Sequence, residues 1–256
     1  ATFIKFTNIV DCFVNFKLSK KKLLDFMEYT CEHPIPSLEL IYPDINFLFF
    51  SNTLFGRIFI DNTKSFFKQT NIDGKELLKS FEKREEFKMM KLLRDFGQHF
   101  SIPINDLSVS TNFSTNTQNI DIFTSKIELE KNKETNPENK KFIKTIKSDK
   151  VALMSYFYSW SSSIDELFDE TLNEFYKLIP NEVIISLQKH FNSYIDNRKT
   201  TIQILPNAIQ KIEQLNKTFI SEDGSRYSIS KGFDVLRFQR NAIEYLLDKI
   251  SSEGEI

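Results

Sequence analysis

The sequence predicts a mainly α-helical fold with a small β element, and three observations support this. Glycine and proline are scarce, with six and seven positions in 256 residues, which favours long helices over a turn-rich β architecture. An apolar stripe of helical spacing runs through residues 153–179, and β-branched residues alternate in part over residues 107–130. This length suits one sizeable domain or two small ones, and we expect a single mainly helical domain over residues 1–256.

The first part of the chain is expected to contain two helices. Residues 19–31 predict a short helix that Ser19 caps and that Pro34 and Pro36 end. Residues 44–69 predict a buried helix, although the β-branched positions 58–60 are also compatible with a strand. The apolar positions of this run at helical spacing are Phe47, Phe50, Leu54, Ile58 and Phe66.

A further helix is expected at about 74–99, with Asp73 as its N-cap. Its apolar residues recur mostly at steps of three and four, which is typical of one buried helix face. Arg94 lies off that apolar stripe. His99 follows Gly97, a residue type that tends to end helices.

The second half of the chain is expected to begin with strands and to continue with helices over residues 148–250. Residues 107–130 predict a β-hairpin or a pair of extended strands, and the polar residues 131–141 predict a mobile loop. Helices are expected at 148–179, at 180–196 with His190, at 207–217 and at 232–250. A hairpin is expected at 218–230. The acidic residues of 148–179 are expected to form a solvated face, and so is the basic cluster of Lys231, Arg237 and Arg240.

The residues with the clearest chemical interest are Arg94, Asp95 and His99. Arginine stays cationic near neutral pH, whereas histidine can gain or lose a proton there, so the two together can hold a phosphodiester and move a proton. On an ideal helix Arg94 and His99 are about 140° apart. We therefore expect either that Gly97 bends the helix end or that the site is completed across a dimer. The spacing is also compatible with an ordinary surface arginine and a helix-terminal histidine.

The segment from Leu92 to Ile104 resembles the signature of the HEPN superfamily, in its abortive-infection and mobile-element branch. The matching positions are Leu93, Arg94, Gln98, His99, Pro103 and Ile104. The segment departs from the pattern at Gly97 and at Asp95, where asparagine is commoner, and a carboxylate near a phosphate is less favourable than an amide. The specific match covers about a dozen residues, a small part of the chain.

The resemblance implies a HEPN-type helical bundle with a small β-hairpin insertion, forming a homodimer through the helices that carry the motif. It also implies metal-independent endoribonuclease activity, often in anti-phage defence or toxin–antitoxin systems, with RNA as substrate and a possible antitoxin or defence partner. Arg94 would hold the scissile phosphate, His99 would transfer the proton and Asp95 would orient one of them. The alternative is a non-catalytic helical protein that binds nucleotide, RNA or a protein partner.

Composition narrows the remaining classes. The net charge of −1 argues against extended non-specific binding of nucleic acid, but it is compatible with a small local phosphate site. Cys12 and Cys31, the only cysteines, indicate a reducing, cytoplasmic location with two structural thiols. We expect no cofactor, no metal site and no membrane-spanning segment, because ligand spacings and long apolar runs are lacking.

Overall fold

The computed structural model describes residues 2–33, 37–112, 117–182 and 184, the short segments 219–220 and 226–227, and scattered positions between 242 and 252. The chain separates into two compact units, one of residues 1–11 and 172–256 and one of residues 12–171. The mainly helical fold with a small antiparallel sheet is confirmed. The helices expected at 180–196, 207–217 and 232–250, with His190 and the basic cluster, lie almost entirely outside the described residues.

The first helix, α1 (Thr2–Glu32), is much longer than expected. The prediction that Ser19 begins a helix was wrong, because the Ser19 hydroxyl donates to the carbonyl of Phe16 at 2.7 Å and so lies inside a continuous helix. The side-chain amide of Asn52, in the next helix α2 (Leu38–Thr70), donates a hydrogen bond to the same hydroxyl at 2.8 Å. This buried polar pair fixes the register between the two helices because neither group has water as an alternative partner.

Helix α2 (Leu38–Thr70) confirms the helix expected at 44–69 but buries a different face. Phe47 and Ile58 are 70% and 45% exposed, so two of the five residues predicted to lie on its apolar face point toward solvent. The buried face includes Phe49, Gly56 and Phe59. Glycine is required at position 56, because an added Cβ would lie 2.6 Å from the Trp160 ring.

The helix expected at 74–99 is two helices, α3 (Lys75–Glu82) and α4 (Glu85–His99). Gly74, not Asp73, is the N-cap of α3. The break occurs because Arg84 takes an extended backbone conformation with φ −66° and ψ 146°. Its guanidinium lies over the Phe81 ring and binds Glu166 at 2.5 and 2.8 Å. The hydrogen-bonded guanidinium of Arg84 also lowers the pKa of Glu166.

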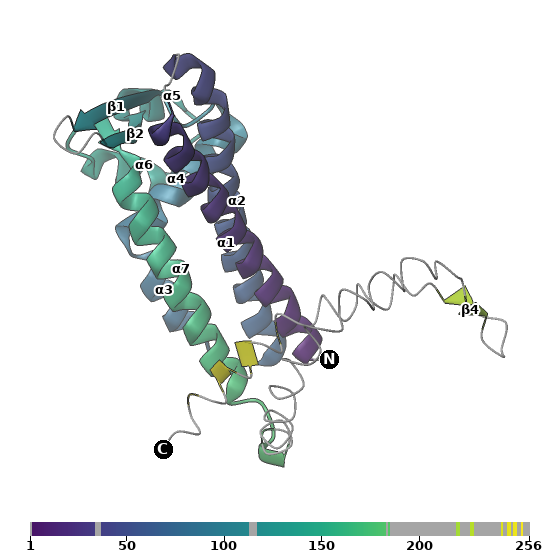
Figure 1. Cartoon of the computed structure of the whole chain (residues 1–256). Coiled ribbons are helices and arrows are strands. Elements are labelled where there is room, and N and C mark those ends of the chain that lie inside the picture. Colours follow the sequence, from purple (N-terminus) through teal and green to yellow (C-terminus); the bar gives the residue numbers. More distant parts are fainter. Residues whose placement is uncertain are drawn as a thin grey trace. The chain divides into compact units, whose positions relative to one another are not determined.

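The sheet expected near 107–130 is present as β1 (Asp106–Asn112) and β2 (Thr117–Ser125), with β3 (Lys150–Ala152) as a third antiparallel strand. Leu107 pairs with Ile122 and Val109 with Ile120, which places alternate apolar residues on the buried face. Figure 1 shows this sheet at one end of the long helices of its unit.

Two short helices follow the sheet where a mobile loop was expected. They are α5 (Lys126–Lys131) and α6 (Pro137–Thr145). The prediction of a loop over 131–141 was therefore wrong for its second half. The side-chain oxygen of Asn136 caps α6 by accepting a hydrogen bond from the backbone N–H of Asn139 at 2.9 Å. Pro137 occupies the first helical turn.

Helix α7 (Leu153–Tyr176) confirms most of the helix expected at 148–179, and its apolar stripe is buried. The expected start was wrong, because residues 150–152 form β3. The acidic face is less uniformly solvated than predicted, because Asp165 pairs with Lys17 of α1 at 2.9 Å and Glu166 pairs with Arg84. Trp160 stacks with Phe16 at 6.4 Å and with Phe87 at 5.8 Å between ring centroids. These aromatic contacts join α1, α4 and α7 in one core.

Outside these helices, β4 (Phe219–Ile220) and β5 (Arg226–Tyr227) pair antiparallel, as the hairpin prediction for 218–230 requires. Cys12 and Cys31 are both half-buried, and burial raises the pKa of the Cys31 thiol. Among the described residues, no helix has the length and apolar character needed to cross a membrane.

We predict that Gly56→Ala destabilises the protein by about 1–3 kcal/mol, because overpacking a rigid core has this cost. Helix propensity alone predicts the opposite sign, a gain of about 0.5–1 kcal/mol. Chemical denaturation followed by circular dichroism measures the difference. Ser65→Ala, on the exposed side of α2, is the control and should change stability by less than about 0.5 kcal/mol. Equal or higher stability of Gly56→Ala would contradict the packing described for Trp160.

Candidate functional site

The last two turns of α4 carry all three predicted site residues. Arg94, Asp95 and His99 line one pocket of about 400 Å³. The opposite wall comes from the end of α5, the turn after it and the start of α6. Its residues are Asn132, Glu134, Thr135, Asn136 and Asn139.

The structure resolves the 140° offset between Arg94 and His99 in a way that the sequence did not suggest. Of the two alternatives, a bend at Gly97 or a site completed across a dimer, neither is settled by the helix bounds, but helix α4 continues through Gly97 to His99, so Gly97 does not end it. Glycine instead gives room to α2, because a Cβ at position 97 would lie 2.3 Å from the Phe50 ring. Both side chains line the same pocket, so a second chain is not needed to bring them together.

Asp95 holds the two walls of the pocket together. One carboxylate oxygen pairs with Nη2 of Arg94 at 2.8 Å. The other accepts hydrogen bonds from the side-chain amides of Asn136 at 3.1 Å and Asn139 at 2.9 Å. The described contacts of Asp95 thus orient Arg94 and anchor α6, and none of them reaches His99.

Arg94 is fixed at the base of the pocket. Its side chain is 22% exposed, and its Nε is buried without a hydrogen-bond partner among the described residues. A buried donor of this kind costs free energy until it is satisfied. The guanidinium therefore combines one satisfied edge, toward Asp95, with a donor that has no partner.

His99 has the opposite character. It is the last residue of α4 and is exposed, and within the described part of the chain no hydrogen bond or ion pair to its ring is recorded. An imidazole in this position can meet a ligand in the pocket without first breaking an internal contact. Either ring nitrogen can then accept or donate a proton.

Sequence reasoning missed the second wall of the pocket. Residues 131–141 were expected to be a mobile loop, yet Asn139 is buried and Asn136 is half-buried there. The available signal was Asn136 followed by Pro137, a pairing typical of a helix start. Glu134 is the one ionisable residue of this wall, and it is exposed at the pocket.

Other residues that carried the HEPN resemblance have structural positions. Gln98 is exposed on α4, whereas Pro103 and Ile104 are buried after the helix end. The Tyr42 hydroxyl donates to the Ile104 carbonyl, which ties this segment to α2. Within the described residues, no group of three or more His, Cys, Asp or Glu side chains is placed to hold a metal ion.

Comparison with known proteins finds no significant match to a protein-family model, a curated protein or a solved structure.

We predict that Asn136→Ala lowers stability by about 1.5–3 kcal/mol, because it removes both the cap of α6 and a hydrogen bond to a carboxylate. Asn136→Ser keeps a capping oxygen and loses only the bond to Asp95, so its cost should be about half. Urea denaturation measures both values. Glu134→Gln, at a neighbouring exposed position, is the control. If Asn136→Ala stays within about 0.5 kcal/mol of the unsubstituted protein, Asp95 does not anchor α6 as described.

Proposed function

We propose that this chain is a metal-independent endoribonuclease of HEPN type, with Arg94 and His99 as its reactive residues. The observation that supports the proposal most directly is that both side chains line one pocket of a single chain. The pocket combines a fixed cation with a titratable imidazole that has no recorded partner in the described structure. These are two of the groups that promote cleavage of RNA by its own 2′-hydroxyl.

In the proposed reaction the ribose 2′-oxygen attacks the adjacent phosphorus, and the bond from phosphorus to the 5′-oxygen breaks. A base removes the 2′-hydroxyl proton, and an acid protonates the leaving 5′-oxygen. The products are a 2′,3′-cyclic phosphate and a 5′-hydroxyl end, so no water, oxidant or metal enters the balance. Arg94 would donate hydrogen bonds to the non-bridging phosphate oxygens, where negative charge grows in the transition state.

Two proton-transfer groups are needed, and His99 supplies one of them. The resemblance to HEPN proteins implies a homodimer, in which a second His99 would supply the other. Glu134 offers a different source, because it lines the same pocket. RNA as substrate, a role in anti-phage defence or a toxin–antitoxin system and an antitoxin partner belong to this proposal through the resemblance alone. A cytoplasmic location belongs to it through the two cysteines.

A non-catalytic binding protein is the second candidate, and the Asp95 ion pair favours it. Asp95 places a carboxylate 2.8 Å from the guanidinium that would have to bind a phosphate. This carboxylate partly neutralises Arg94 and repels an incoming anion. A protein that binds nucleotide, RNA or a protein partner without cleaving it tolerates this arrangement better than a catalyst does.

We predict that His99→Ala and Arg94→Ala each reduce RNA cleavage by about 10²–10⁴-fold, since each removes a group that acts in the transition state. Purified protein is incubated with a fluorescent single-stranded RNA, and the products are resolved by gel electrophoresis. His33→Ala is the matched control, because His33 is also exposed and follows directly after the end of a helix. Cleavage should persist in EDTA. It should disappear when the 2′-hydroxyls are replaced by 2′-O-methyl groups.

Three results would reject the ribonuclease proposal. They are full activity of both variants, cleavage that EDTA abolishes, and an unsubstituted protein that cuts no RNA. An inactive protein that still binds RNA or nucleotide would establish the second candidate. Sedimentation of the same samples tests the homodimer, which a monomer at micromolar concentration would contradict.

We predict that Asp95→Asn raises cleavage by about fivefold, because removing a charge about 5 Å from the phosphate is worth about 1 kcal/mol at an effective dielectric constant between those of protein and water. The amide oxygen can still accept from Asn136 and Asn139, so α6 should stay in place. Initial rates at subsaturating RNA measure the effect, with thermal melting as the control for folding. A loss of activity in a folded variant would show that orientation of Arg94 by Asp95 matters more than charge.

A further inference from the structure

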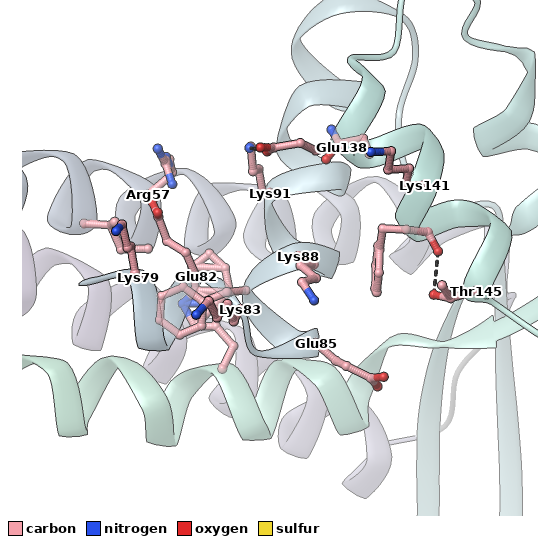
Figure 2. Close-up of a pocket in the computed structure, with 15 residues that line it drawn as sticks. Arg57, Lys79, Glu82, Lys83, Glu85, Lys88, Lys91, Glu138, Lys141 and Thr145 are labelled. Atoms are coloured by element: carbon pink, nitrogen blue, oxygen red, sulfur yellow. Dashed lines mark hydrogen bonds and ion pairs between the residues drawn. The ribbon is translucent and has the colours of Figure 1, made fainter. Parts of the chain in front are cut away.

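A second and larger pocket is lined by other residues of α4 and α6 and shares only Asn139 with the Arg94–His99 pocket. Its volume is about 530 Å³, and its walls come from α2, α3, α4, α6 and α7. Ile60, Phe87, Phe142 and Trp160 form an apolar floor and are all buried. Figure 2 shows charged side chains from several helices around this floor. We call it the lysine pocket.

The rim of the lysine pocket has more basic than acidic residues, although the chain has a net charge of −1. Two of the basic residues, Arg57 and Lys79, are paired with Asp61 and Glu76, which do not line the pocket. Six cationic and three acidic side chains line it. Of the acidic ones, Glu82 is paired with Lys64 at 2.6 Å and Glu138 with Lys91 at 2.8 Å. Positive charge on this rim therefore exceeds what its own carboxylates neutralise.

Three exposed rim lysines have no ion pair or hydrogen bond from the side-chain ammonium group among the described residues: Lys83, Lys88 and Lys141. Lys83 and Lys141 still interact electrostatically with Glu76 and Glu138, because they help to lower the pKa of these carboxyl groups. The three lysines come from the junction of α3 and α4, from α4 and from α6, and they lie at separate places along the pocket (Figure 2). Like charges gathered around one cavity repel one another, and a bound polyanion would remove this repulsion.

The floor is partly aromatic. Trp160 is 3% exposed, its ring stacks with Phe16 and Phe87, and the edge that carries its indole nitrogen faces α2 at Gly56. The aromatic floor suits a flat, weakly polar group, whereas the lysine rim suits phosphate.

We propose that the lysine pocket binds a nucleoside phosphate, with its base against the aromatic floor and its phosphates on Lys83, Lys88 and Lys141. The volume lies within the range of small-molecule sites, about 300–1,000 Å³. A ligand that is only anionic would leave the floor unused, and one that is only apolar would leave the lysines unpaired. The ligand can be a free nucleotide or one unit of an RNA strand, since both present the same chemistry.

This proposal does not depend on ribonuclease activity. Asn139 lines both pockets, so α6 is a wall that they share, but Arg94 and His99 do not line the lysine pocket. His99→Ala should therefore abolish cleavage and leave nucleotide binding intact. Failure of one proposal can thus be told apart from failure of the other.

The test is a titration of the whole chain with ATP, adenosine, inorganic tripolyphosphate and a six-nucleotide RNA. Trp160 is the only tryptophan in the chain and lines the pocket, so its fluorescence reports occupancy of this site. Isothermal titration calorimetry gives the affinities without optical interference from the base. We expect ATP to bind at least tenfold more tightly than adenosine or tripolyphosphate. Its affinity should fall as the salt concentration rises.

Lys88→Gln and Lys141→Gln should each weaken ATP binding by about tenfold, because each removes a charge-assisted hydrogen bond. Lys144→Gln is the matched control, since Lys144 is an exposed lysine of α6 that does not line the pocket. Thermal melting confirms that the variants fold. If the short RNA binds and ATP does not, with the same dependence on Lys88 and Lys141, the ligand of the pocket is one unit of an RNA strand. The proposal is overturned if neither ATP nor the short RNA binds, if tripolyphosphate binds as tightly as ATP, or if Lys144→Gln weakens binding as much as the rim variants.

Discussion

The packing of Trp160 is the constraint on which the arrangement of the larger unit depends. Its ring stacks against Phe16 of α1 and Phe87 of α4, and its edge meets α2 at Gly56, where no Cβ fits. One side chain of α7 therefore sets the spacing of three other helices. Aromatic side chains bury large areas in few rotamers, so a core built on them specifies helix positions tightly. The same ring lines the lysine pocket, so that pocket inherits its geometry from the core.

A second, polar constraint joins the end of α4 to the start of α6. The Asp95 carboxylate binds Arg94 within α4 and two asparagine amides at the start of α6, and one of these, Asn136, also caps α6. Hydrogen bonds to a charged acceptor are the stronger kind, and in a half-buried setting they also fix orientation. Folding of the segment after α5 and orientation of Arg94 thus depend on the same carboxylate. A residue that departs from the HEPN pattern is here a structural centre of the site.

How much of this was predictable depends on the range of the interaction. Local signals predicted α7, the strands near 107–125 and the helical character of α2 and α4, because periodicity and turn residues are written in adjacent positions. The break at Arg84 was not predicted, and the Arg84 guanidinium binds Glu166, 82 positions away, a contact that leaves no local pattern. The continuation of α1 through Ser19 was also missed, and the partner of the Ser19 hydroxyl, Asn52, likewise lies on another helix. Arg94 and His99 were found from their chemistry, but their common pocket depends on residues 132–139.

The two pockets divide the charge in a way that bears on any phosphate ligand. The charge of Arg94 is balanced by the carboxylate of Asp95. The ammonium groups of Lys83, Lys88 and Lys141 have no ion pair among the described residues. Attraction of an anion over several ångströms therefore arises mainly from the lysine pocket, and the Arg94–His99 pocket contributes directional hydrogen bonds at contact distance. If RNA is the ligand, binding free energy and proton transfer are assigned to two neighbouring pockets that share Asn139 of α6. Weak attraction at Arg94 is then no obstacle, because the strand is held next to it.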